Sequence, residues 1–232
     1  MIHGETTRRS PSLDADHLLA RLRERGVAQL RDERAIWVIL DGSDLRKPHA
    51  REMEGLQRVK RLAGGGTVPG YRTMNAIGVG MERRGLLYHH LFSSTADDFV
   101  SESVETQAAL TATGAALAPL DTDVTYILDA GFDDIAVWDT IWMQEAHVVV
   151  RVRDHTRLVH AAATAPACHL HECARGLRPL AHAETEMVVR KVGQPREKLQ
   201  AVTAVVAAVP LVLRYQHAAR MAAPREWRER AL

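Results

Sequence analysis

The sequence contains only two cysteines among its 232 residues, Cys168 and Cys173. Two cysteines cannot supply a disulfide framework for a chain of this length, so we expect the reducing cytoplasm as its environment. The sequence also lacks any run of about 18 apolar residues, and we expect no membrane-spanning helix. Residues 1–5 lack the basic-then-apolar pattern of a signal peptide. We therefore expect neither a secreted disulfide scaffold nor an integral membrane protein.

Lysine and arginine are absent from residues 85–146, which carry 11 Asp and Glu. Residues 1–84 carry 16 Lys and Arg against 11 acidic residues, and residues 147–232 carry 14 against 7. The formal net charge of +1 therefore conceals a basic, acidic, basic arrangement. This arrangement is typical of a protein that binds a polyanion and has an acidic cation site in its middle. A solvated acidic helix with loops would produce the same pattern.

Two apolar, β-branched and aromatic runs each end on an aspartate. Residues 36–41 end at Asp41, and residues 124–129 end at Asp129. A buried strand that delivers a carboxylate at its C-terminal end is a common component of metal sites, because hard divalent cations prefer oxygen ligands. The two runs therefore predict that Asp41 and Asp129 converge as metal ligands. Two carboxylates alone hold a divalent metal poorly, so a complete site needs a third.

The hydrophobic pattern predicts a mixed α/β sheet. An N-terminal helix through about residue 32 precedes the first aspartate strand, and residues 42–75 are polar, basic and irregular. We then expect two strands joined by a hairpin turn, at 74–79 and 86–92, and a helix at 101–117. The second aspartate strand follows at 124–129, a further helix at 135–145 and another strand at 147–152. Beyond residue 158 the helical signal is weak, and strands are expected at 187–190 and 202–215.

Three further motifs leave other functions open. A phosphatase of the haloacid dehalogenase type also begins with a strand that ends on a nucleophilic Asp, but it needs a second Asp where this sequence has Ser43. Residues 147–157 alternate so that Arg151 and Arg153 share one face of a strand, which suits either phosphate contacts or a solvated edge strand. The Cys-His-Leu-His-Glu-Cys segment at 168–173 has no partner Cys pair, and we expect no zinc site.

The sequence resembles the DDE transposases of bacterial insertion sequences, specifically insertion-sequence family four. The segments that carry the resemblance occur in the family's order at 37–48, 68–75, 87–94, 127–134 and 137–142. Together they span the chain from about residue 8 to about residue 220. The resemblance implies an RNase H-like mixed sheet with flanking helices, in which the first and fourth strands carry the first two catalytic aspartates.

The resemblance also implies three domains, namely an N-terminal helical remnant at 1–34, the RNase H-like catalytic core at 35–158 and the beginning of a β-rich insertion at 159–232. Members of the family carry a larger DNA-end-binding domain before the core. A helix beyond their insertion carries Tyr, Arg, a third catalytic Glu and Lys at fixed spacing. Here Tyr215 is followed by Arg220, and no Glu stands at that spacing. We therefore expect a chain that is truncated at both ends and lacks the third carboxylate.

The resemblance assigns catalysis and the binding of Mg²⁺ or Mn²⁺ to Asp41 and Asp129. In the family, one ion activates the attacking water or DNA 3′-hydroxyl, and the other stabilises the leaving oxygen. Contacts to DNA phosphates are expected from five basic residues of this sequence. They are Arg46, Lys47, Arg72, Arg151 and Arg153.

The function implied by the resemblance is DNA cleavage and strand transfer at insertion-sequence ends. The implied partners are transposon ends and target DNA, homodimers form in the family, and the implied location is the nucleoid in the bacterial cytoplasm. We expect this chain alone to be inactive, because the third Glu is missing. A DNA-binding or interfering remnant without catalysis is the alternative. A metal-dependent phosphohydrolase is a further alternative, which Ser43 disfavours.

Overall fold

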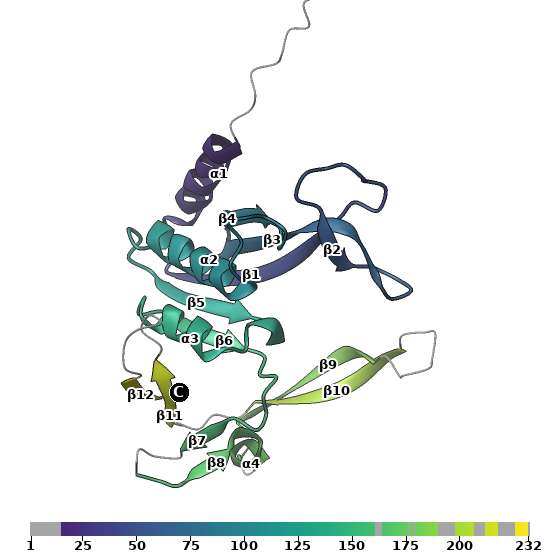
Figure 1. Ribbon diagram of the computed structural model, residues 1–232. Coiled ribbons are helices and arrows are strands. Elements are labelled where there is room, and N and C mark those ends of the chain that lie inside the picture. Colours follow the sequence, from purple (N-terminus) through teal and green to yellow (C-terminus); the bar gives the residue numbers. More distant parts are fainter. Residues whose placement is uncertain are drawn as a thin grey trace, which may run out of the picture. The chain divides into compact units, whose positions relative to one another are not determined.

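The computed structural model describes residues 15–160, 164–175, 177–178, 180–189, 198–206, 212–217 and 226–231 (Figure 1). The chain divides into two compact units, here called unit 1 (Met1–Arg153) and unit 2 (Asp154–Leu232). The boundary between them lies five residues before the predicted end of the catalytic core at residue 158. Among the described residues, no helix is both long enough and apolar enough to span a membrane.

Unit 1 is built on a six-stranded mixed sheet. Its strands are β1 (Ala35–Arg46), β2 (Gln57–Lys60), β3 (Thr67–Val79), β4 (Arg84–Phe92), β5 (Asp123–Leu128) and β6 (His147–Val150). β3 is antiparallel to β1, β2 and β4, whereas β5 is parallel to both β1 and β6. The predicted mixed α/β class is confirmed.

β1 and β3 are long strands that form one antiparallel ribbon, from the pair Trp37 and Val79 to the pair Arg46 and Gly70. β4 extends the sheet beside one end of β3, and β2 pairs with the other end. The segment 44–72, here called the arm, projects beyond the helices of unit 1 (Figure 1). The prediction that 42–75 is irregular is wrong, because β1 continues past Asp41 by pairing with β3.

The described part of unit 1 has four helical elements, two of which begin at a capping side chain. The four elements are α1 (Ala15–Leu30), α2 (Glu102–Leu117), the short 3₁₀ helix η1 (Ala130–Phe132) and α3 (Ile135–Trp142). Ser101 caps α2, because its Oγ accepts a hydrogen bond from the amide of Val104 at 3.2 Å. Asp134 caps α3 by accepting one from the amide of Ala136 at 2.8 Å. Each cap satisfies an amide that the helix itself leaves unpaired.

The strands of the sheet present one buried face and one open face. On β1, Ile36, Val38 and Leu40 are at most 2% exposed, and they lie on the face against which the helices pack. The alternate residues belong to the open face. Five large apolar residues of that face are between 39% and 57% exposed, and they are Trp37, Ile39, Ile77, Leu91 and Val149.

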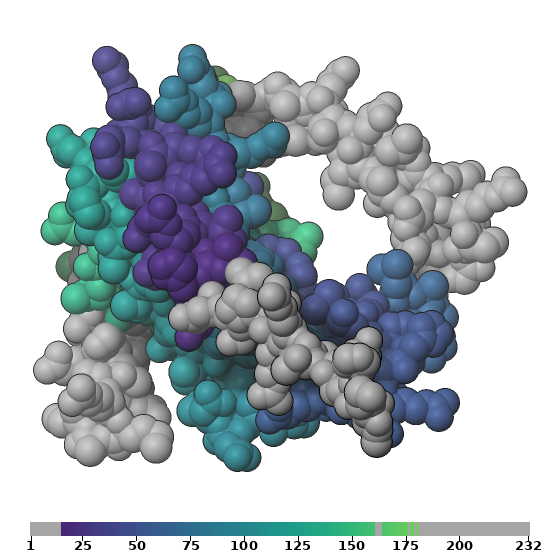
Figure 2. Space-filling view, turned by 90° about the horizontal axis from the view of Figure 1, so that it is seen from above, coloured from purple at the N-terminus to yellow at the C-terminus, as the bar shows by residue number. Residues whose placement is uncertain are grey.

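Glycines set how closely α1 approaches the sheet. A Cβ at Gly26 of α1 would collide with the carbonyl oxygen of Leu86, and a Cβ at Gly85 would collide with the backbone of Gly26. The close approach buries Leu30 completely. Most of the remaining surface of α1 is exposed, as Figure 2 shows for this helix in purple.

Unit 2 consists mainly of strands. Its elements are β7 (Leu158–His160), β8 (Ala167–His169), the short helix α4 (Leu170–Arg175), β9 (Ala181–Val189), β10 (Lys198–Val206), β11 (Val212–His217) and β12 (Glu226–Ala231). β9 and β10 form a two-stranded sheet, and a second sheet has the order β12-β11-β7-β8. The run predicted as one strand at 202–215 is divided between β10 and β11. Pro210, between them in the sequence, has no amide hydrogen for a sheet ladder.

Candidate functional site

Asp41 and Asp129 occupy corresponding positions on two adjacent parallel strands. The register of β1 with β5 ends at the pair Ile39 and Ile127, and each aspartate lies two residues further along its own chain segment. Because the parallel ladder of β1 and β5 ends just before them, both aspartates lie where the two strands part, Asp41 within β1 and Asp129 directly after β5. Both line a single cleft of about 400 Å³. The structure thus brings together the two aspartates that the sequence singles out.

Polar residues continue from Asp41 across the sheet. Asp41 is paired in register with Asn75 of β3, and Asn75 is paired with His89 of β4. The Nδ1 of His89 lies 2.7 Å from the Oδ1 of Asn75, and the Nδ2 of Asn75 donates to the Oγ1 of Thr73 at 3.1 Å. The open face therefore carries a row of polar residues across three strands at the position of Asp41.

Acidic and basic side chains meet in the cleft. Lys60, Arg72, Glu102 and Asp134 line it together with the two aspartates. Arg72 forms an ion pair with Glu102, and its Nε lies 3.7 Å from the Oδ1 of Asp44. Lys60 forms no ion pair with any described carboxylate, so its positive charge is available to an anion that enters the cleft.

One oxygen of each aspartate is occupied by a local hydrogen bond. The Oγ of Ser43 donates to the Oδ2 of Asp41 at 2.9 Å, and the amide of Gly131 donates to the Oδ1 of Asp129 at 2.7 Å. The second oxygen of each carboxylate accepts no hydrogen bond from the described residues. Mg²⁺ is commonly bound by one or two carboxylates together with phosphate oxygens of the substrate. The carboxylates of Asp41 and Asp129 are therefore suited to be two protein ligands of such a cation.

A third carboxylate ligand is not available in the described part of the chain, where no group of three His, Cys, Asp or Glu residues could hold a metal ion. Glu102 reaches the cleft, but it is engaged by Arg72. Asp134 also lines the cleft, and it caps α3. Of the residues compared with the family's third motif, Tyr215 lies in β11 and Arg220 falls outside the described residues.

The five basic residues predicted to contact DNA fall in three places. Arg72 lines the cleft. Arg46 and Lys47 belong to the arm, where the Nε of Arg46 donates to the carbonyl oxygen of Lys60 at 2.7 Å. The amide of Lys47 donates to the carbonyl oxygen of Pro69 at 2.8 Å.

Arg151 and Arg153 lie outside the cleft lining. The prediction that they share one face of a strand is wrong, because β6 ends at Val150. The amide of Arg151 bonds the carbonyl oxygen of Leu128 at 3.1 Å, and the amide of Arg153 bonds the carboxylate of Asp133 at 2.6 Å. Both side chains are exposed.

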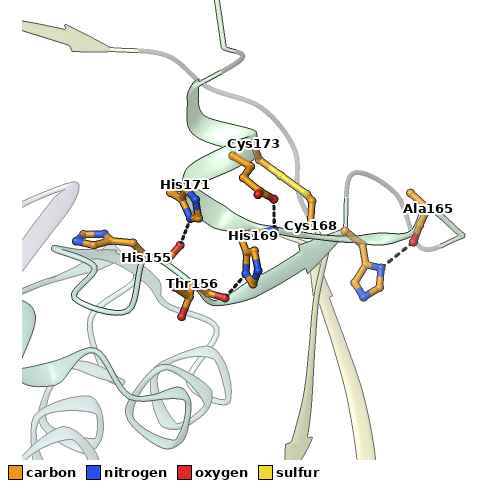
Figure 3. The surroundings of a disulfide bond; sticks show 9 residues. His155, Thr156, Ala165, Cys168, His169, His171 and Cys173 are labelled. Carbon is orange, nitrogen blue, oxygen red and sulfur yellow. Dashed lines mark hydrogen bonds between the residues drawn. A yellow bond between two sulfur atoms is a disulfide. The ribbon is translucent and has the colours of Figure 1, made fainter.

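Cys168, Cys173, His169 and His171 lie together in unit 2 (Figure 3). Cys168 and Cys173 form a disulfide that was not predicted from the sequence, with their Cα atoms 6.8 Å apart. The rings of His169 and His171 stack with centroids 5.6 Å apart. Their Nδ1 atoms lie 2.7 and 2.9 Å from backbone carbonyl oxygens. Because a carbonyl only accepts, each Nδ1 carries the hydrogen in these bonds.

Sequence reasoning missed several residues of the cleft. Lys60 belongs to a strand of only four residues, in which Gln57 and Val59 are buried while Arg58 and Lys60 are exposed. This alternation was the available signal. Glu102 was not predicted as a cleft residue, because its approach to the cleft depends on where α2 packs against the sheet.

Fold and site together define a mixed α/β protein with two aspartates in one cleft, where the parallel ladder of adjacent strands ends. No family model matches the chain, and no curated protein sequence matches it. Among solved structures, the chain is similar to a chain of the Mos1 strand transfer complex, at 16% sequence identity and a TM-score of 0.31. The similarity covers 65% of this chain and 46% of that chain, so less than half of the Mos1 chain is spanned. A TM-score of this size establishes neither a family nor a function.

Proposed function

We propose that this protein acts on DNA through metal-dependent phosphodiester chemistry at Asp41 and Asp129, as a DDE transposase of insertion-sequence family four does. The observation that carries the proposal is the register of β1 and β5, which brings Asp41 and Asp129 to one cleft. Three antiparallel strands, β1, β3 and β4, followed by the parallel strands β5 and β6 support an RNase H-like core.

Within this proposal, Asp41 and Asp129 are the residues that hold Mg²⁺ or Mn²⁺. A bound divalent cation supplies an activated oxygen nucleophile and stabilises the leaving oxygen of the phosphodiester. Ser43 and the Gly131 amide hold the two carboxylates in place through the hydrogen bonds that they donate. Lys60 adds positive charge beside the phosphate, where negative charge develops during the reaction.

The experiment that tests the site is a Mn²⁺ titration followed by electron paramagnetic resonance. We expect the D41N/D129N variant to lose the Mn²⁺ binding of the wild-type protein. The matched control is D121N/D123N, because Asp121 and Asp123 are exposed and lie at the amino end of β5, whereas Asp129 follows its carboxyl end. Equal Mn²⁺ binding by both variants, or none by the wild type, would overturn the assignment.

A DNA-binding protein without catalysis is the second candidate, and the missing third carboxylate ligand among the described residues favours it. We expect the purified chain to bind DNA but to give no strand transfer in Mg²⁺. Mg²⁺-dependent transfer that disappears in D41N would instead establish a complete enzyme. For the phosphohydrolase alternative we expect no turnover of p-nitrophenyl phosphate. A phosphatase needs its second Asp, the general acid, at the position of Ser43, and here the Ser43 hydroxyl donates a hydrogen bond to Asp41 instead.

A further inference from the structure

We infer that the arm, residues 44–72, binds the phosphate backbone of a DNA duplex and leads it into the carboxylate cleft. This inference rests on the proposed function and extends it to three basic residues that were not predicted from the sequence. They are Arg58, Lys60 and Arg61.

The arm carries an excess of positive charge that the described carboxylates do not neutralise. Residues 46–61 contain six Lys and Arg against two acidic residues, Glu52 and Glu54. Arg46 approaches Asp44 at 3.9 Å, but Arg58, Lys60 and Arg61 form no ion pair with any described carboxylate. A projecting element with uncompensated positive charge attracts the phosphates of DNA, whose binding releases condensed counterions.

The basic side chains of the arm are positioned by its strands. In β2, Arg58 and Lys60 are exposed on one face, about 6.6 Å apart along the strand. The guanidinium of Arg58 donates to the Oγ1 and carbonyl oxygen of Thr67 at 2.9 and 3.1 Å. Because the Arg58 side chain is already ordered, a bond to a phosphate costs less conformational entropy than it would on a flexible loop.

The base of the arm is held in place by hydrogen bonds. Gln57 is 5% exposed, and its Oε1 accepts hydrogen bonds from the amide and hydroxyl of Ser94 at 2.9 and 2.6 Å. The hydroxyl of Tyr71 donates to the carbonyl oxygen of Glu54 at 2.5 Å. The Gln57 bonds hold β2 to Ser94 outside the arm, and the Tyr71 bond joins two segments of the arm itself, which distinguishes the arm from a solvated basic loop.

Three successive glycines at the tip of the arm present no side chain to a partner. Gly64, Gly65 and Gly66 have φ angles of +80°, +72° and +75°, a conformation that favours glycine. The space around each of them is open. Arg61 follows β2 directly and closes the tip through its amide, which bonds the carbonyl oxygen of Gly66 at 3.0 Å.

The basic surface of the arm is continuous with the cleft. Lys60 belongs to β2 and also lines the cleft with Asp41 and Asp129. Arg72, at the other end of the arm, lines the same cleft. A DNA backbone bound by Arg58, Lys60 and Arg61 would therefore reach the two aspartates.

The test compares DNA binding by two variants that lose the same charge. The arm variant is R58S/K60S/R61S. The control is R23S/R25S/R31S, in which Arg23 and Arg25 belong to α1 and Arg31 directly follows it. All three control residues are exposed, and α1 (purple) and the arm (blue) occupy separate parts of the surface in Figure 2. Fluorescence anisotropy with a short labelled duplex gives the dissociation constant between about 50 and 200 mM salt.

We expect the arm variant to bind the duplex at least about tenfold more weakly. The slope of log affinity against log salt should fall by about 2 to 3, because each phosphate that is no longer neutralised lowers it by roughly 0.9. The control should change affinity less than about threefold. An R58K/R61K variant, which keeps both charges, should retain most of the binding, and thermal unfolding checks that each variant is folded.

Equal weakening of DNA binding by the arm and control variants would overturn the inference, since net charge alone would then explain it. No weakening by the arm variant would also overturn it, as would tighter binding of a single strand than of the duplex. Failure of the metal site is distinguishable, because D41N/D129N would then leave Mn²⁺ binding unchanged while the arm variant still weakened DNA binding.

Discussion

At the scale of single residues, neighbours in the sequence have opposite environments because strands alternate. Ile39 is 44% exposed on the open face, while Leu40 is 2% exposed beneath the helices. Asp41, the next residue, again lies on the open face. A carboxylate on that face remains accessible to a cation and to an anionic substrate, whereas the same group one position earlier would be buried among apolar side chains without a partner.

The contrast between Leu40 and Ile39 can be measured directly. We expect Leu40→Thr to lower the free energy of unfolding by more than about 2 kcal/mol, because it removes a buried apolar side chain and buries a hydroxyl group. Ile39→Thr should lower it by less than about 1 kcal/mol, since the site is half exposed and threonine suits a strand. Urea denaturation of both variants checks the difference, and equal losses of stability would contradict the two-faced sheet.

Glu33 should make stability depend on pH. Its carboxylate accepts hydrogen bonds from the amides of Met81, Glu82 and Arg83 at 2.9, 3.3 and 3.1 Å. These bonds hold the pKa of Glu33 below its ordinary value, and the bond from the Met81 amide has the largest effect. A carboxyl group whose pKa is lowered by folding stabilises the fold above its unfolded pKa, and this contribution disappears as the pH falls through the folded pKa.

We therefore expect Glu33→Gln to lower the melting temperature by a few degrees near neutral pH. The difference from the wild type should close as the pH falls below about 4.3. Glu24→Gln is the control, because Glu24 is exposed and pairs only with Arg21. Melting curves followed by circular dichroism check the result, and a difference that persists unchanged to pH values well below the folded pKa would contradict it.

At the scale of elements, the arm depends on close packing between strands. A Cβ at Gly70 of β3 would lie 2.5 Å from the carbonyl oxygen of Leu45 and 2.6 Å from the Cγ2 of Val59. These are neighbouring atoms of β1 and β2, so any side chain at this position would separate the strands. Gly42 of β1 has only ordinary van der Waals neighbours at 3.8 Å and beyond.

Gly70→Ala should therefore lower the free energy of unfolding by about 1 to 3 kcal/mol through overpacking. Gly42→Ala should be close to neutral or slightly stabilising, because it only reduces the entropy of the unfolded chain. Hydrogen exchange of the arm amides in both variants checks the difference. Comparable protection of the arm in the two variants would show that the close approach at Gly70 does not matter.

At the scale of the whole molecule, the chain consists of two compact units with different means of stabilisation. Unit 1 has an extensive apolar core beneath its helices. Unit 2 contains the disulfide between Cys168 and Cys173. Compact units of one chain can unfold separately, and each then shows its own transition.

We expect a dithiol reductant to destabilise unit 2 and to leave unit 1 unchanged. Loss of a disulfide that closes so short a loop costs about 2 kcal/mol in the chain-entropy model. Hydrogen exchange resolved by peptide reports each unit separately, and a Cys168→Ser/Cys173→Ser variant should behave like the reduced protein. An equal loss of protection in both units would show that they unfold together.

The parts of the fold that the sequence predicted have strong local signals. The strands at 86–92 and 124–129 have long apolar runs, and Ser101 precedes α2 in a capping position. The arm was missed because β2 has only four residues, and its alternation has meaning only against the ladder with β3. The disulfide was missed because the pairing of Cys168 with Cys173 depends on how α4 follows directly after β8.

The sequence by itself determined that two apolar runs form strands and are each followed by an aspartate, Asp41 and Asp129, since alternating and β-branched residues encode strands locally. Only the tertiary structure decided that β1 and β5 are adjacent, parallel and in register, and that Lys60, Arg72 and Glu102 reach the same cleft. The reason is physical: strand formation depends on neighbouring residues, whereas strand order and register depend on which apolar faces the distant helices bury together.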